Sequence, residues 1–243
     1  MADFYTVLLN SLKQRDIWDP AAREGVYVQY RPQEIYAVLA LESERHQCAV
    51  VGEDLGIVPP AVRSAMARHN VDGMYVMAIE LHDDAQQPYT KPKRRSVASF
   101  GTHDLPPFAA FWQGSDIDLR ESLGVLDAKR GKAEIVERRK ALRALTALMR
   151  KRGLIEDHNA ADALKGCLGV LSESAARRVI VNLEDLWLEE RPQNVPGTSG
   201  EQHANWRHRT KYGLDELETG VPAVEEALGV LRTKRPRKRK VKS

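Results

Sequence analysis

The sequence predicts a soluble α/β fold, and two observations support this prediction. Short apolar segments rich in valine alternate with segments of helix-forming composition, which is the order expected when helices connect strands. The 243 residues are 42% hydrophobic and 29% charged, a balance typical of a soluble chain that buries a core. This composition excludes a collagen, a disulfide-stabilised scaffold and a wholly disordered chain.

Four segments fit buried strands, because each is short, apolar and contains valine or isoleucine. They are residues 48–51, 74–81, 97–100 and 178–183. Helices are expected where the composition or the apolar periodicity favours them, over residues 33–45, 59–69 and 116–152.

The sequence favours a reducing, cytoplasmic location. No apolar run approaches the roughly 20 residues that span a bilayer, and the first residues lack the basic and apolar regions of a secretory signal. Cys48 and Cys167 lie in apolar segments without metal-ligand spacing, so we expect both to be small core residues. We predict neither a cofactor nor a metal site.

The net charge of +3 comes from the C-terminus. Residues 232–243 hold eight lysines and arginines and no acidic residue, and the rest of the chain is mildly acidic. Such a run can bind nucleic acid, but it lacks interleaved aromatic residues and belongs to no DNA-reading fold. We therefore interpret it as a solvated, disordered tail and expect no nucleic-acid partner.

Two acidic motifs follow predicted strands. In VVGEDLGIVPP, Glu53 and Asp54 come directly after a strand and before a proline pair, and in SFGTHDLPP, His103 and Asp104 do the same. In parallel α/β architecture the C-terminal ends of strands gather at one mouth, where catalytic residues lie. The sequence therefore predicts that Glu53 and Asp104 share a pocket.

Two carboxyl groups in one pocket suit glycosidic chemistry. A protonated carboxylic acid donates to the leaving oxygen, and an ionised one stabilises the oxocarbenium-like transition state. From these residues alone, Glu53 is the better proton donor and Asp104 the nucleophile of a retaining pair. The alternative is that either acid caps the helix that follows it, since the helix dipole favours acidic residues there.

Three long segments carry a family resemblance: ALESERHQCAVVGEDLGIVPPAVR, SFGTHDLPPFAAFW and NVPGTSGEQHANWRHR. In order and spacing they resemble the C-terminal part of the 4-alpha-glucanotransferases called amylomaltases or disproportionating enzymes, glycoside hydrolase family 77. The resemblance runs from about residue 25 to about residue 209. It implies a retaining transglycosylase that cuts an α-1,4-glucan donor and passes the glycone to the 4-hydroxyl of an acceptor glucan.

The resemblance also implies residue roles. Glu53 is similar to the family's general acid/base, and Asp104 to its third carboxylate, which replaces the nucleophile interpretation. His103 resembles the partner that binds the same sugar, and the Asn-x-Pro-Gly segment of the sugar site maps onto Asn194, Pro196 and Gly197. Asp83 lies near an acidic sugar contact of the family, and Asp54 either orients a sugar or caps a helix.

Several other residues keep two interpretations. Glu184 and Asp185 end the last predicted strand and are either structural or part of the site. Four aromatic residues either form sugar-stacking platforms or pack in the core: Tyr27, Tyr30, Trp112 and Trp206.

The chain departs from the family pattern at its N-terminal end. The family's nucleophile is an Asp in an Arg-x-Asp-His motif about fifty residues before the acid/base, and Asp3 has neither flanking residue. The implied fold is the C-terminal half of a (β/α)8 TIM barrel, about four βα units with helical insertions and a basic tail. We expect an unassigned segment over 1–24, the partial barrel over 25–231 and the tail over 232–243.

A half barrel leaves strand edges unpaired, so we expect a separate N-terminal barrel half as a partner. The alternative function is a catalytically inactive glucan-binding or vestigial protein.

Overall fold

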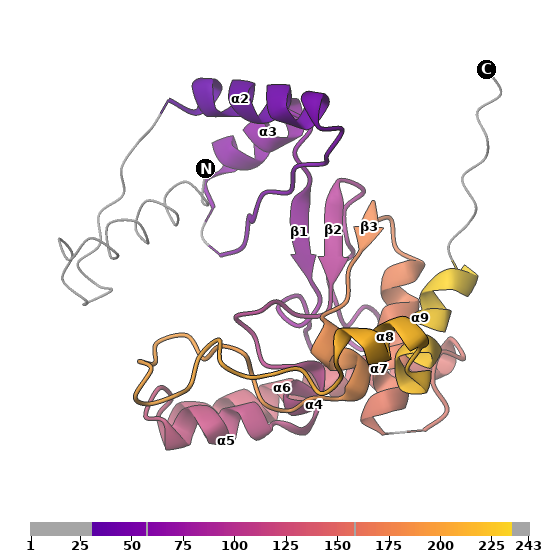
Figure 1. The fold of residues 1–243 in the computed structure, drawn as a ribbon. Helices are drawn as coiled ribbons and strands as arrows, with labels where there is room; N and C mark the ends of the chain where they lie inside the picture. The colour runs from indigo at the N-terminus through magenta and orange to yellow at the C-terminus, as the bar shows by residue number, and fades with distance from the viewer. Residues whose placement is uncertain (1–30, 57, 158, 235–243) are drawn as a thin grey trace. The chain divides into compact units, whose positions relative to one another are not determined.

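The computed structural model describes residues 31–56, 58–157 and 159–234 (Figure 1). Its sheet has three strands in the order β1-β2-β3: β1 (Gly73–Val76), β2 (Ser96–Ser99) and β3 (Arg178–Val179). The helices of the described residues are α2 (Pro32–Arg45), α3 (Pro60–Arg68), α4 (Phe108–Gln113), α5 (Ser115–Ser122), α6 (Ala128–Lys151), α7 (Ala160–Ser172), the 3-10 helix η1 (Leu183–Trp187), α8 (Leu214–Thr219) and α9 (Pro222–Lys234). The α/β prediction is confirmed.

Strands β1 and β2 run parallel. The amide of Gly73 donates to the carbonyl of Arg95 at 3.1 Å, and that of Met77 donates to Ser99 at 2.9 Å, so the same offset along the chain recurs in the same direction. This is the register of a parallel pair.

The strand predicted over 97–100 matches β2 to within one residue, whereas the other three predicted strands are longer than the observed ones. Residues 48–51 form no strand, and Val51 makes a single parallel bridge to Asp72. Strand β1 ends at Val76, where the amide of Ile79 turns back to the Val76 carbonyl, and β3 is two residues long. The predicted lengths of these three strands were wrong because apolar composition indicates burial. The length of a strand depends instead on where the hydrogen bonds to its partner strand end.

The helix predictions are confirmed for α2 and α3, which opens with Pro60 at its first position. The helical composition over 116–152 is also confirmed, and this region forms two helices, α5 and α6. Gly124, with φ 71°, follows the end of α5, and the Asp127 side chain accepts a hydrogen bond from the amide of Arg130 and begins α6.

The chain divides into two compact units, and the division falls inside β1 and β2. Within the first, Met1–Met74 with Arg95–Val97, the described core gathers α2, α3 and the loops beside them: Tyr36, Val58, Val62, Ala65, Met66 and Val71. Within the second, Tyr75–Arg94 with Ala98–Ser243, the larger core packs Met77, Phe100 and Phe108 against α6 and α7.

The two cysteines differ in environment. Cys167 of α7 is fully buried, as predicted, and burial raises the pKa of its thiol to about 12. Cys48 is exposed, so the prediction of a core residue was wrong there. It follows the turn that ends α2, where Gln47 takes a left-handed conformation (φ 49°) and directs the chain over the surface.

None of the helices in the described parts of the chain has the length and apolar character needed to cross a membrane. From residue 235 onward the basic tail lies outside the described residues, as do residues 1–30, which contain Asp3, Tyr27 and Tyr30.

Candidate active site

The second acidic loop forms the centre of the candidate site. Asn194 donates a hydrogen bond from Nδ2 to Oδ1 of Asp104 at 2.6 Å, and Nε2 of His103 lies 3.4 Å from Oδ2 of the same carboxylate. The Asp104 side chain remains 50% exposed. A small pocket of about 40 Å³ is lined by Asp104, Asn194 and Pro196 together with apolar residues. The structure thus brings together predicted site residues that are far apart in the sequence.

The segment that supplies Asn194 is held by one side chain that the sequence reasoning missed. Asn205 accepts a hydrogen bond from the amide of Val195 at 2.9 Å and donates to Oγ1 of Thr198 at 2.9 Å. Gly197 between them has φ 86°, a conformation that favours glycine. Gly197 therefore shapes the turn that presents Asn194. Asn205 lies inside the NVPGTSGEQHANWRHR segment, but its role depends on hydrogen bonds across the folded loop, which the sequence does not reveal.

A buried charge cluster forms one wall of the same pocket. Asp116 and Arg120 line this pocket. Arg138 of α6 donates hydrogen bonds to both carboxylate oxygens of Asp116, with Nη2 3.0 Å from Oδ2. Glu134 accepts from Arg120 and Arg138 at 2.6 Å each. Burial raises the pKa of Glu134, but these hydrogen bonds and charges outweigh it and hold the pKa below its ordinary value. The cluster fixes α5 against α6 with every charge paired.

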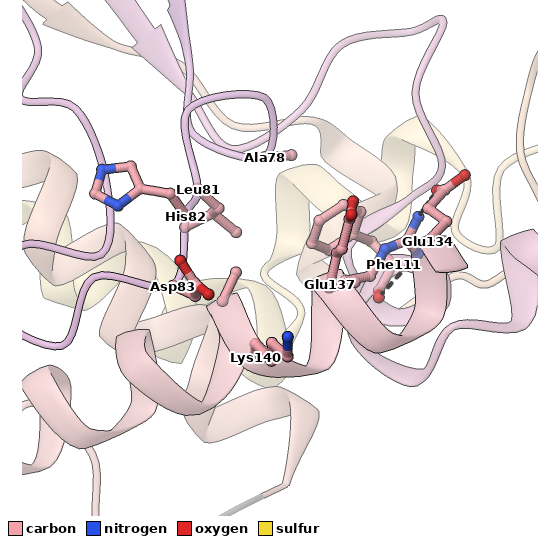
Figure 2. A pocket seen from close by; sticks show the side chains of 10 residues that line it. Ala78, Leu81, His82, Asp83, Phe111, Glu134, Glu137 and Lys140 are labelled. Atoms are coloured by element: carbon pink, nitrogen blue, oxygen red, sulfur yellow. Dashed lines mark hydrogen bonds and ion pairs between the residues drawn. The ribbon is translucent and has the colours of Figure 1, made fainter. Parts of the chain in front are cut away.

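Asp83 lies in a different pocket from Asp104. This second pocket, of about 500 Å³, is lined by Leu81, His82 and Asp83 from the segment after β1 and by Phe111 and residues of α6. Figure 2 shows His82 and Asp83 on that segment, with Glu137 and Lys140 on the helix. The predicted sugar contact at Asp83 therefore does not join the group around Asp104.

The first acidic loop lies in the first compact unit. Asp54 accepts from Nε of Arg63 at 3.2 Å and from the amide of Met74 at 2.8 Å, and its side chain is 16% exposed. These contacts tie the loop to α3 and β1 and favour the structural interpretation of Asp54. Glu53 is exposed. Because Glu53 and Asp104 belong to different units, their common pocket stays a prediction.

Comparison with known proteins decides the family. Residues 13–215 match the family described as 4-alpha-glucanotransferase, glycoside hydrolase family 77. The chain belongs to this family. It is 31% identical over 201 residues to the 4-alpha-glucanotransferase of Haemophilus influenzae, and 34% identical over 192 residues to that of Mycobacterium tuberculosis strain H37Rv. These alignments cover 78% and 76% of this chain but 29% and 26% of the relatives.

Two solved structures share the fold of this family 77 chain. The amylomaltase from Corynebacterium glutamicum superimposes with a TM-score of 0.73 at 24% identity, covering 84% of this chain and 32% of that one. The amylomaltase from Streptococcus agalactiae, solved in complex with acarbose, gives 0.54 at 16% identity, over 86% and 36%. The described fold therefore corresponds to about a third of a larger family member.

In this family 77 chain, Asp185 has a structural contact. It lies in η1, is 1% exposed and accepts a hydrogen bond from the amide of Phe108 at 2.7 Å, at the start of α4. Burial raises the pKa of Asp185 to about 7, against the opposing effect of that hydrogen bond. Asp185 anchors the helix that follows the His103–Asp104 loop. Glu184 precedes it on η1 and does not line the Asp104 pocket.

Proposed function

We propose that this chain is the C-terminal part of a 4-alpha-glucanotransferase, which transfers segments of α-1,4-glucans such as maltooligosaccharides, starch or glycogen to an acceptor glucan. The observation that carries the proposal is the hydrogen bond from Asn194 to Asp104, which unites two family motifs in one pocket. Family membership supports it, as do the names of the relatives. The acarbose bound by the Streptococcus agalactiae amylomaltase supports a sugar ligand.

In this proposal Asp104 holds the glucose unit at the cleavage point. Asn194 occupies Oδ1 of Asp104 and fixes the carboxylate plane, so that Oδ2 and the His103 ring face the sugar hydroxyls. The Asp104 carboxylate is half exposed, and its negative charge stabilises the oxocarbenium-like transition state. Asn194, Pro196 and the turn at Gly197 complete the substrate-binding group.

Glu53 is the general acid/base of the proposed reaction. Its carboxyl proton goes to the glycosidic oxygen as the C1–O bond breaks and a carboxylate nucleophile bonds to C1. The resulting Glu53 carboxylate then takes the proton of the acceptor 4-hydroxyl as that oxygen displaces the nucleophile. Asp54, tied to Arg63 and Met74, holds the loop that carries Glu53, and a sugar contact by Asp54 or Asp83 belongs to the same proposal.

The nucleophile comes, in this proposal, from a separate N-terminal barrel half. The partial barrel spans 25–231 with about four βα units, and the coverage of the relatives supports it. Exposed apolar side chains at Ile79, Ile180 and Leu183 are consistent with a flank that another chain segment covers. The unpaired Cys48 and Cys167 agree with a cytoplasmic location.

Maltotriose disproportionation by the chain, alone and co-expressed with the part of the Haemophilus influenzae relative that precedes the matched region, tests the function. We expect glucose and longer maltooligosaccharides from the co-expressed pair and none from the chain alone. Transfer would be absent in both samples if the chain were an inactive glucan-binding protein, while calorimetric titration with maltotetraose would still show binding. Absence of both transfer and binding would refute the proposal.

A further inference from the structure

Trp206 is an exposed aromatic side chain on the loop that carries Asn194. It is 59% exposed, whereas Trp187 is 8% exposed and Trp112 stacks on Phe108 with 5.7 Å between ring centroids. Trp187 is therefore buried, and Trp112 is partly buried and packs against the core, which favours the core interpretation for Trp112. Trp206, in contrast, presents its ring to solvent, where an apolar face of a ligand can pack on it.

The backbone at Trp206 is held in an uncommon conformation. Its φ of 62° lies in the left-handed region, which a bulky residue rarely adopts. The amide of Trp206 donates to the carbonyl of Gln193 at 2.7 Å, and the neighbouring Asn205 bonds across the loop to Val195 and Thr198. These hydrogen bonds thus hold the backbone that carries the indole.

The indole lies beside the candidate site. Its ring centroid is 5.5 Å from that of His103, at an interplanar angle of 48°, and His103 in turn contacts Asp104. The His103 side chain is 62% exposed. The flat apolar face of the Trp206 indole therefore lies next to the polar side chains of Asp104, His103 and Asn194.

We propose that Trp206 is a stacking platform for the glucose unit next to the one that Asp104 holds. A pyranose ring presents a face of C–H bonds that packs on the π surface of an indole, while its hydroxyl groups at the rim stay hydrated or reach polar groups. Strain stored at an exposed aromatic residue beside a binding group is typical of a ligand contact. The inference rests on the proposed function, because it requires a glucan as ligand.

Calorimetric titration of the full chain with maltotetraose tests the platform. We expect Trp206→Ala to weaken binding about tenfold and Trp206→Tyr to stay within about threefold of the wild-type chain, since tyrosine keeps a stacking face. Leu214→Ala is the matched control, because Leu214 is another exposed apolar side chain (78%) that does not line the Asp104 pocket, and its affinity should be unchanged. Wild-type affinity in Trp206→Ala would overturn the platform while leaving the proposed function in place. No binding by the wild-type chain would also overturn the platform, whereas the proposed function would be decided by the transfer assay of the co-expressed pair.

A thermal unfolding measurement separates a ligand contact from a structural role. Asparagine tolerates the left-handed conformation better than tryptophan, so Trp206→Asn should unfold at the same temperature or higher while losing glucan affinity. Unfolding of Trp206→Asn at a clearly lower temperature would show that the indole stabilises the fold, and would contradict the platform.

Discussion

The two acidic loops share a sequence pattern but are held in different ways. Both place an acidic residue before a proline pair at the end of an apolar segment. In the first, Asp54 is fixed by Arg63, nine residues away, and by the amide of Met74. In the second, Asp104 is fixed by Asn194, 90 residues away, and the next helix starts on Asp185.

The two loops differ in which acidic residue is held by the protein and which is exposed. Both carboxylate oxygens of Asp54 accept hydrogen bonds from the protein, whereas its neighbour Glu53 is exposed. Asp104 receives one amide donor and remains half exposed, with a histidine and a tryptophan beside it. The contacts of Asp54 favour a structural role in the first loop, whereas in the second loop the held acid, Asp104, is half exposed.

The largest expected effect separates Glu53 from its neighbours. Glu53→Gln in the co-expressed pair should lower the rate of maltotriose transfer by about 10²- to 10⁴-fold, because the amide can neither give nor take the proton. Glu44→Gln, an equivalent change at an exposed residue of α2, should leave the rate unchanged. Transfer by Glu53→Gln at the wild-type rate would end the assignment of Glu53 as acid/base.

The sequence predicted the parts of this site that are carried by contiguous motifs. His103, Asp104, Asn194 and Pro196 were found because each motif is a short run of neighbouring residues, and the structure brings them into one group. The charged wall was missed, because Arg138 reaches Asp116 from a different helix and nothing in the spacing links the two.

For the fold, too, the features set by neighbouring residues were predicted, and those set by distant residues were not. Helix α3 follows from its prolines, since proline acts locally on the backbone. The end of β3 depends on hydrogen bonds to a distant strand, and composition does not encode it. The prediction of a buried Cys48 was wrong for a local reason, because Cys48 is exposed directly after the left-handed turn at Gln47.

The second prediction concerns the anchor of the second loop and its pH dependence. The folded chain holds the proton of Asp185 more tightly than the unfolded chain, because the pKa rises from 3.8 to about 7. Folding stability should therefore be greatest below pH 4 as far as Asp185 is concerned and fall as the pH rises from about 4 to about 7. At about 1.4 kcal/mol per pKa unit, the loss amounts to roughly 4 kcal/mol.

Urea unfolding of the wild-type chain and of Asp185→Asn across this pH range measures that loss. The variant keeps an acceptor for the Phe108 amide but has no proton to release, so the stability difference between the two should change with pH. A constant difference from pH 4 to pH 7 would contradict a raised pKa.

The third prediction tests whether Asp54 is structural. Asp54→Ala leaves the partly buried Met74 amide without this acceptor and should lower the free energy of unfolding by about 1–3 kcal/mol. Arg63→Ala removes the more exposed partner of the ion pair and should cost less than about 1 kcal/mol. Urea unfolding compares them; equal small losses would show that the Met74 contact contributes little and would reopen a sugar-binding role for Asp54.

The last prediction concerns Asn194, whose removal leaves the Asp104 carboxylate without its amide donor. Asn194→Ala should raise KM for maltotriose in the co-expressed pair about tenfold with kcat little changed, because Asp104 keeps its charge and loses only its fixed orientation. Asp104→Asn should instead lower kcat and weaken binding together, because the charge that stabilises the transition state is gone. If the two variants showed the same kinetic defect, Asn194 would act on the chemical step itself, and the distinction between the group that orients and the group that carries the charge would fail.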